Sequence, residues 1–225
     1  YNGKSAEVSD SFLSGQRFDV KYARVNYNDT PAVDVTVSGI TAMGRAYDGT
    51  TVAALTGGTL DGVAEGDDVS LDMTGVTAAF ADGNVGTAKP VTVTGKPGLT
   101  GADAGKYTLI QPDLSGLTAD ITPCESFTDA TERNQTIRVG GSSFSEPRFT
   151  GVTVGGSAEA VDGDVVYTLE RNTAEPADIA AALKELKAGE KLEIGYTFTA
   201  KGNYKGTAKG TVTVTAQEYT GGSSG

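Results

Sequence analysis

The chain has 225 residues, a formal net charge of -11 at pH 7 and no histidine. An acidic surface repels phosphate backbones and anionic lipid headgroups, which argues against general nucleic-acid binding and against docking on anionic membranes. The absence of histidine removes the usual general base, and the single cysteine, Cys124, leaves no Cys/His set for zinc and no internal disulfide.

Glycines and β-branched residues favour short strands in this chain. It contains 31 Gly, 7% aromatic residues and no Trp, and it is rich in Thr and Val. Thr and Val are stiff at χ1 and suit pleated, half-buried strands, whereas Gly supplies turns and bulges. No stretch approaches the roughly 20 apolar residues of a membrane span. The composition therefore predicts an all-β protein with many short strands.

The first 36 residues form a region of their own in the sequence. Phe18, Val20 and Tyr22 alternate with polar residues, which predicts a strand, and the segment Asn28–Pro31 then ends it. Two interpretations stay open. The region is either the trailing part of a preceding module, which we favour, or an N-terminal extension that packs on the next module of the chain.

Tyr47-Asp48-Gly49 is the most informative motif of the chain. An Asp-Gly pair between β-prone flanks is a tight-turn signal, because Gly tolerates positive φ and Asp tolerates it better than most residues. We interpret Tyr47 as an aromatic residue that anchors this turn in the core. The alternative interpretation is a recognition loop.

Further residues come after this motif in a fixed order. They are Leu60–Val63, Gly66–Val69, Phe80, Gly86, Lys89, Val91–Val93 and Gly101–Leu109. The ordered set resembles the YDG module, an immunoglobulin-like β unit that is repeated in large bacterial surface proteins, and the resemblance covers about residues 37–122. It implies a β-sandwich, a bacterial cell-surface location and a structural role for Tyr107, but no ligand. Lys106 departs from the Gly-Asn-Tyr sequence that is common in such modules.

A second module is predicted over residues 123–218. Val and Thr alternate in Gly210–Thr215, as expected for a closing strand. One helix is expected at about Pro176–Lys187, because apolar residues recur there at i, i+4 and i+7. Proline suits its first turn, lysines suit its last turn, and Gly189 suits the position just past its end.

The two modules share a local sequence echo. Gly105-Lys106-Tyr107 and Gly202-Asn203-Tyr204 each open a late pair of strands. The second of these is similar to the closing region of many bacterial immunoglobulin-like surface repeats. A tyrosine at this place packs its ring in the core and directs its hydroxyl to backbone near a loop, which predicts a structural role for Tyr204.

We therefore predict an all-β fold of tandem immunoglobulin-like β-sandwich modules, with one short helix in the second module. The predicted parts are 1–36, a partial preceding module or extension; 37–122, the YDG-like module; 123–218, the second module; and 219–225, a flexible tail rich in Gly and Ser.

Carboxylates are the remaining candidates for chemistry. A glycosidase needs two of them across a cleft, but a chain with 29 acidic residues offers such pairs by chance. Five aspartates in Gly-containing turns supply the hard oxygen ligands that calcium prefers: Asp67, Asp68, Asp82, Asp162 and Asp164. None has EF-hand spacing, and we interpret them first as turn residues. We expect no cofactor, no bound metal and no catalytic activity.

The predicted function is mechanical. The sequence favours a structural or adhesive stalk segment of a bacterial cell-surface protein, of the Gram-positive kind, that is extracellular and presents a distal binding region. Its partners would be neighbouring modules of the same polypeptide. The alternative is a module that binds a glycan or a host protein through exposed tyrosines. The candidates for that role are Tyr1, Tyr22, Tyr27 and Tyr219.

Overall fold

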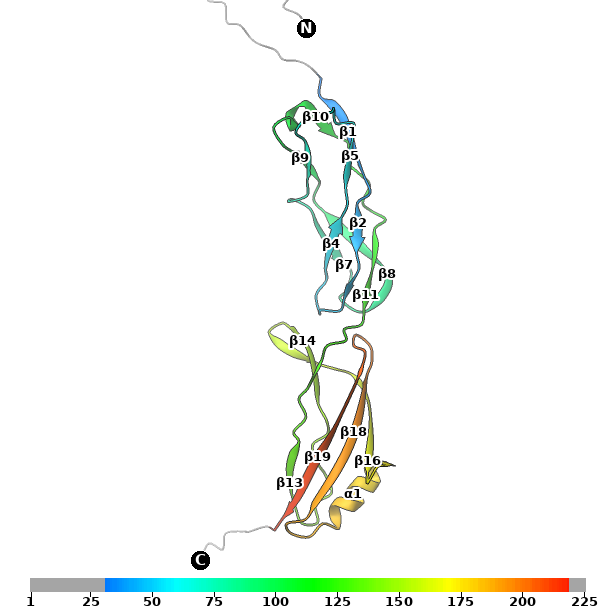
Figure 1. Ribbon diagram of the computed structural model, residues 1–225, viewed down its shortest axis with the longest axis vertical. Helices are drawn as coiled ribbons and strands as arrows, with labels where there is room; N and C mark the ends of the chain where they lie inside the picture. Colours follow the sequence, from blue (N-terminus) through cyan, green and yellow to red (C-terminus); the bar gives the residue numbers. More distant parts are fainter. Residues whose placement is uncertain (1–30, 219–225) are drawn as a thin grey trace, which may run out of the picture. The chain divides into compact units, whose positions relative to one another are not determined.

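The computed structural model describes residues 31–218 (Figure 1). The described residues are mostly strands, with one α-helix, which confirms the all-β prediction at that level. None of their helices is long and apolar enough to cross a membrane. The strand predicted at Phe18–Tyr22, the tail 219–225, and the candidate tyrosines Tyr1, Tyr27 and Tyr219 lie outside the described residues.

The chain divides into two compact units. The described part of the first comprises residues 31–39, 58–75 and 96–112, and that of the second comprises residues 40–57, 76–95 and 113–218. The residues predicted as one module, 37–122, are therefore shared between both units. The residues predicted as the other module lie wholly in the second unit, so the boundary at Pro123 falls inside a compact unit. The division into two separate sandwiches stays a prediction.

The first unit is a small β structure. Its elements are β1 (Val33–Ser38), β5 (Thr59–Asp61), β6 (Ser70–Asp72), β9 (Gly98–Thr100), the 3-10 helix η2 (Ala104–Lys106) and β10 (Tyr107–Leu109). Strand β1 pairs with β10 in parallel and with β5 antiparallel, while β6 pairs with β9. Val35 is fully buried and Tyr107 is 9% exposed. Pro97 is also buried, and these three residues supply the buried apolar side chains of the unit.

The second unit begins with a six-stranded sheet. Its strands are β2 (Thr41–Met43), β3 (Arg45–Ala46), β4 (Val52–Thr56), β7 (Thr77–Phe80), β8 (Gly86–Thr94) and β11 (Thr118–Thr122). The order is β2-β4-β7-β8-β11-β3. Because β2 and β3 are consecutive, residues 41–46 pair antiparallel with β4 at one edge and parallel with β11 at the other. A bulge in β8 places Ala88 at φ 47°, and the Asp120 carboxylate accepts its N–H at 2.7 Å.

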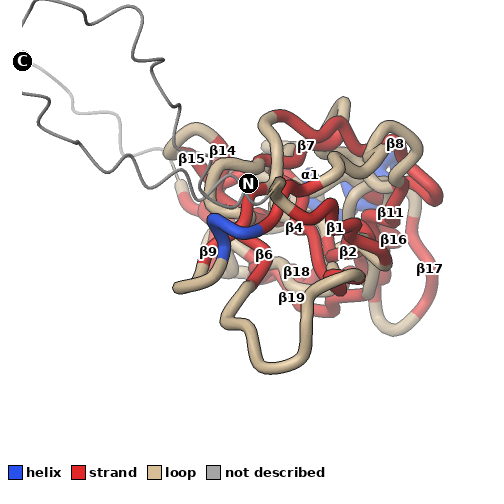
Figure 2. The backbone as a smooth tube through the Cα atoms, turned by 90° about the horizontal axis from the view of Figure 1, so that it is seen from above, coloured by secondary structure: helices blue, strands red, loops and turns tan. Residues whose placement is uncertain are grey.

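The rest of the second unit contains eight strands and one α-helix. The strands are β12 (Thr128–Asp129), β13 (Asn134–Arg138), β14 (Phe149–Val154), β15 (Ser157–Ala160), β16 (Gly163–Leu169), β17 (Asn172–Ala174), β18 (Lys191–Ala200) and β19 (Thr207–Gln217). They form the sheets β12-β14-β15 and β13-β19-β18-β16-β17. Strands β19, β18 and β16 lie side by side in Figure 1, and Figure 2 labels the same three strands in a view from above. The strand predicted at Gly210–Thr215 lies in β19, with Val212 and Val214 fully buried.

One hydrophobic cluster runs through the second unit. It contains side chains from before and after Pro123, such as Phe80, Ile121, Phe149 and Phe198. The rings of Phe149 and Phe198 are stacked, with centroids 3.8 Å apart and an interplanar angle of 9°. Since the cluster is continuous, the six-stranded sheet and the strands after Pro123 share one core.

The helix α1 spans Pro176–Lys184. Its start and its apolar stripe are as predicted, since Ile179 and Leu183 are almost fully buried. It ends three residues earlier than predicted because the backbone after Lys184 tightens into i,i+3 hydrogen bonding. Gly189, expected just past the helix, has φ +86°.

Candidate functional site

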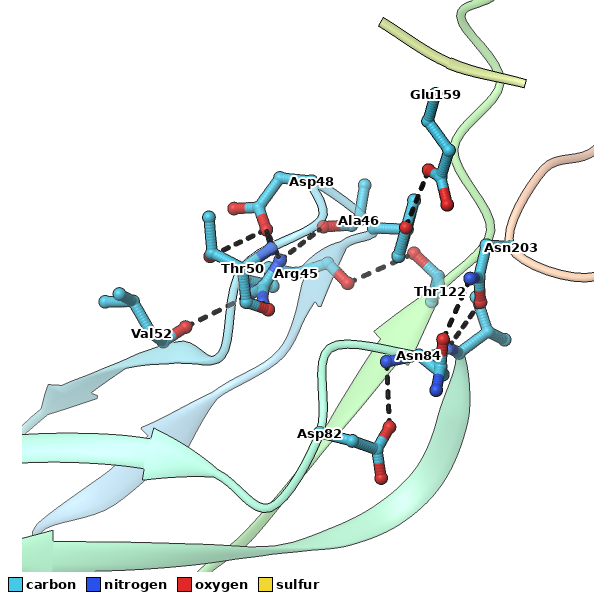
Figure 3. Close-up of polar contacts among 12 residues, drawn as sticks. Arg45, Ala46, Asp48, Thr50, Val52, Asp82, Asn84, Thr122, Glu159 and Asn203 are labelled. Atoms are coloured by element: carbon cyan, nitrogen blue, oxygen red, sulfur yellow. Dashed lines mark hydrogen bonds and ion pairs between the residues drawn. The ribbon is translucent and has the colours of Figure 1, made fainter. Parts of the chain in front are cut away.

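The Tyr47-Asp48-Gly49 motif forms a turn with a side-chain acceptor at its centre. The Asp48 carboxylate accepts both the backbone N–H and the hydroxyl of Thr50, each at 2.8 Å (Figure 3). The next residue, Gly49, has φ +76°. Burial alone would raise the pKa of Asp48, but these hydrogen bonds and the charge of Arg45 outweigh it, so the pKa is lowered. The turn predicted from the sequence is present in this form.

Arg45 holds the two sides of this turn together. Its guanidinium donates to the carbonyl oxygens of Ala46 and Val52, both at 3.1 Å, and of Thr50 at 2.5 Å, and it also forms an ion pair with Asp48 (Figure 3). The guanidinium carbon lies 5.5 Å from the centroid of the Phe80 ring. A guanidinium carries several N–H donors in a rigid plane, so it can bind these carbonyl oxygens at once, whereas a lysine presents a single ammonium.

Two tyrosine hydroxyls meet on one carboxylate oxygen in the second unit. Tyr47 donates to Oε2 of Glu159 at 2.7 Å, and Tyr204 donates to the same oxygen at 3.0 Å. The Tyr204 hydroxyl also accepts the N–H of Val152 at 2.9 Å. The two rings make an edge-to-face contact with centroids 5.4 Å apart. Burial and the neighbouring carboxylate raise the pKa of Tyr204 to about 12, so both hydroxyls remain donors at neutral pH.

Two asparagines form a second contact beside the tyrosines. The Asn203 side chain accepts the N–H of Val85 and donates to the side-chain oxygen of Asn84, both at 3.0 Å (Figure 3). The backbone oxygen of Asn203 accepts the N–H of Cys124 at 2.9 Å. Cys124 in turn pairs with Tyr204 as an isolated parallel bridge.

We call Tyr47, Asn84, Glu159, Asn203 and Tyr204 the junction cluster. Two of these side chains lie before Pro123 in the sequence and three lie after it. Two glycines make the close approach possible. A Cβ atom on Gly49 would collide with the Val154 side chain, and one on Gly151 would collide with the phenol ring of Tyr204.

A related arrangement surrounds Tyr107 in the first unit. Its hydroxyl donates to Oδ2 of Asp67 at 2.6 Å and accepts the N–H of Ala64 at 3.0 Å. The Lys106 ammonium forms ion pairs with Asp67 at 3.1 Å and Asp103 at 2.7 Å. Hydrogen bonds from Tyr107 and Lys106 lower the pKa of Asp67. Sequence reasoning assigned Tyr107 a structural role, and its buried ring and paired hydroxyl agree with that role.

Comparison with known protein families finds the family that the Tyr47-Asp48-Gly49 motif indicated. The family described as the YDG domain matches residues 30–115. A YDG domain is therefore found in this chain. It begins and ends seven residues earlier than the module predicted at 37–122, and it includes the Tyr47-Asp48-Gly49 turn and Tyr107. No curated protein and no solved structure matches the chain.

The calcium candidates within the YDG domain all bind internal donors. Asp67 binds the Tyr107 hydroxyl and the Lys106 ammonium. One oxygen of Asp68 accepts the N–H of Ala102 at 3.0 Å. Asp82 accepts the N–H of Asn84 at 2.8 Å and pairs with the Lys89 ammonium at 2.6 Å. Thus Asp67 and Asp68 come together in the first unit, and Asp82 lies in the second unit.

The other two calcium candidates lie after the YDG domain. Asp162 accepts the N–H of Gly163 at 2.8 Å, and Asp164 pairs with Lys201 at 2.5 Å. Over residues 31–218, no three or more His, Cys, Asp or Glu side chains are grouped so as to hold a metal ion. All five candidates therefore act as acceptors that order turns or ion pairs.

Sequence reasoning missed three members of the junction cluster and Arg45. Glu159 is a single acid in a short edge strand, and nothing in its neighbourhood marks it as the partner of a tyrosine 112 residues away. Asn84 and Asn203 look like ordinary turn residues. Arg45 alone had a local signal, because it stands three residues before Asp48, a spacing that allows an ion pair.

Proposed function

We propose that the protein is a non-catalytic structural or adhesive stalk segment of a bacterial cell-surface protein, located outside the cell. Its β modules would be immunoglobulin-like and would hold a distal binding region in place. The junction cluster is the observation that carries this proposal. It ties the part of the YDG domain that lies in the second unit to the residues after Pro123, and a stalk requires fixed joints between its modules.

The connection at Pro123 is tied on both sides. Before it, the carbonyl of Thr122 accepts the N–H of Tyr47 at 2.8 Å; after it, the carbonyl of Cys124 accepts the N–H of Lys205 at 2.9 Å. Pro123 itself has a restricted φ. A connection with bonded neighbours and a proline between them bends far less than a Gly/Ser linker.

Strand pairing supports the immunoglobulin-like part of the proposal. In the YDG domain, residues 41–46 pass from one sheet edge to the other, with antiparallel pairing to β4 and parallel pairing to β11. After Pro123, β13 pairs in parallel with the last strand, β19. A segment that passes from one sheet edge to the other, and a strand that runs parallel to the last strand, are compatible with a two-sheet sandwich.

The residue types and the contacts of the carboxylates favour a structural role over catalysis. Histidine is absent from the whole sequence. The carboxylates considered for calcium or for glycoside hydrolysis already accept hydrogen bonds or ion pairs from their own turns. These contacts give each carboxylate a structural task within its own turn.

The alternative function, recognition through exposed tyrosines, gains no support from the described residues. All five tyrosines among residues 31–218 are at most 9% exposed: Tyr47, Tyr107, Tyr167, Tyr196 and Tyr204. Four of their hydroxyls donate to carboxylates of the chain itself: those of Tyr47, Tyr107, Tyr196 and Tyr204. Any such recognition would depend on the four tyrosines outside the described residues.

Small-angle X-ray scattering on the purified chain, with and without calcium, tests the stalk proposal. We expect an elongated particle with the same scattering profile in both conditions. A compact particle would contradict the stalk role. A profile that becomes more extended only with calcium would contradict a joint that is fixed by protein contacts alone.

A further inference from the structure

A parallel pairing joins β13 to β19, the last strand of the described chain (Figure 1). It contains five residue pairs, from Asn134 opposite Thr213 to Arg138 opposite Gln217. The other parallel pairings between strands are shorter, with three pairs for β1 and β10 and two pairs for β3 and β11. The pairing of β13 with β19 is therefore the longest contact of this kind among residues 31–218.

This geometry decides how tension along the chain reaches the paired strands. The chain enters β13 at Asn134 and leaves β19 at Gln217, and these two residues lie at opposite ends of the ladder. Tension between residues before β13 and residues after β19 therefore acts along both strands and loads all five pairs together. In an antiparallel hairpin, by contrast, both free ends lie at the same end of the ladder, so tension breaks the pairs one after another.

Hydrogen bonds continue the ladder beyond both ends of β13. Just before this strand, the carbonyl oxygen of Arg133 accepts the N–H of Thr213 at 2.7 Å. Just after it, the N–H of Val139 donates to the carbonyl oxygen of Gln217 at 3.0 Å. The Val139 side chain is 46% exposed, so this last backbone bond can be removed by substitution without opening the core.

Buried side chains shield one side of the ladder from water. Val214 and Ala216 of β19 are fully buried. Gln135 of β13 is 8% exposed, and its side chain donates to the carbonyl oxygen of Ser145 at 2.8 Å and accepts the N–H of Ser145 at 2.7 Å. Breaking a hydrogen bond is more costly where water cannot replace the lost partner.

We propose that the ladder between β13 and β19 is the force-bearing element of the residues after Pro123 and resists tension applied along the chain. The use of this property rests on the proposed function, because a stalk carries tension between its anchored end and its bound end. The property itself belongs to the parallel ladder. It goes beyond the junction cluster, which fixes an orientation but does not lie along this ladder.

Single-molecule force spectroscopy on the full chain tests the inference by comparing two directions of pulling. Both chains carry Cys124→Ser and one handle at the C-terminus. In the first chain, Glu125→Cys supplies the other handle before β13, so tension acts along the ladder. In the second chain, Ser142→Cys supplies it after β13, so tension enters and leaves at the same end of the ladder. Both replaced side chains are exposed.

We expect an unfolding force about twofold higher along the ladder than in the other direction, because all five pairs must break together. Val139→Pro removes the N–H that bonds to Gln217 and should lower the force along the ladder. Leu183→Ala is the control, because it empties a fully buried site in α1. It should lower Tm more than Val139→Pro does, yet lower the force along the ladder less.

Equal forces in the two directions would overturn this inference, and so would forces that follow Tm across the variants. In either case an elongated particle in solution scattering would leave the stalk proposal standing. A compact particle with a higher force along the ladder would give the opposite result: the stalk proposal would fail and the force-bearing ladder would remain.

Discussion

Replacing Tyr204 by phenylalanine should lower the stability of the second unit much more than the same change at Tyr167. The Tyr204 side chain is 3% exposed, and its hydroxyl makes two hydrogen bonds, one from Val152 and one to Glu159. Tyr204→Phe keeps the ring but leaves the Val152 N–H without its acceptor. A buried donor without a partner costs about 1–3 kcal/mol, and the bond to a carboxylate adds to this cost.

The half-exposed position of Glu159 reduces the second contribution, because water can replace the lost donor there. We therefore expect a loss of about 2–3 kcal/mol in the free energy of unfolding. For a cooperative unit of this size, this corresponds to a decrease in Tm of roughly 5–10 °C. Chemical denaturation followed by circular dichroism, with thermal unfolding alongside, measures both values.

Tyr167→Phe is the matched control. Tyr167 is also buried, at 8% exposed, but its hydroxyl makes no hydrogen bond to another described residue, and burial raises its pKa to about 12. We expect this change to cost less than about 0.5 kcal/mol. Equal costs for the two variants would refute the role given to the Tyr204 hydroxyl.

Three further predictions concern single contacts. Glu170 and Arg171 have φ of 46° and 72° at the tip of the β16–β17 hairpin. Replacing the pair by Asn-Gly, which tolerates these angles, should raise the free energy of unfolding in urea by about 1–2 kcal/mol. An unchanged or lower urea concentration at the unfolding midpoint would contradict this. Because hydrogen bonds lower the pKa of Asp67 below 3.8, the stability it provides is full above that pH and is lost as pH falls through the lowered pKa. Acid unfolding of Asp67→Asn should show a smaller pH dependence than the unmodified protein, and identical curves would argue against the assignment. Gly151→Ala should lower Tm by several degrees because the added Cβ collides with the buried ring of Tyr204. Gly105→Ala is the control and should leave Tm unchanged, because a Cβ at Gly105 has no atom within 4 Å. Similar Tm values for both variants would contradict the packing described.

Local chemistry made part of this structure predictable. The Tyr47-Asp48-Gly49 turn follows from φ preferences and a side-chain acceptor within three residues. The helix at Pro176 follows from an apolar stripe and a proline, and only its end was set too late. In both cases the residues that determine the local structure are close together in the sequence, so their types alone predict the turn and the helix.

The junction cluster was not predictable because its contacts are distant in sequence. The bond from Tyr47 to Glu159 spans 112 residues and that from Asn203 to Asn84 spans 119. Nothing local distinguishes Glu159 from other exposed-looking acids in short strands. The sequence also placed a boundary at Pro123, because a proline and a change of motif occur there, whereas the shared core continues across it.

The central claim is that the part of the YDG domain that lies in the second unit, residues 40–57 and 76–95, and the residues after Pro123 are held at one fixed orientation. Distances between two spin labels test it most directly. Thr56 on β4 and Thr136 on β13 are exposed and can each be replaced by a labelled cysteine, with Cys124→Ser removing the native thiol. We predict one narrow distance distribution, which broadens when Tyr47→Phe and Glu159→Ala are combined. A broad distribution with the junction cluster intact would contradict the claim.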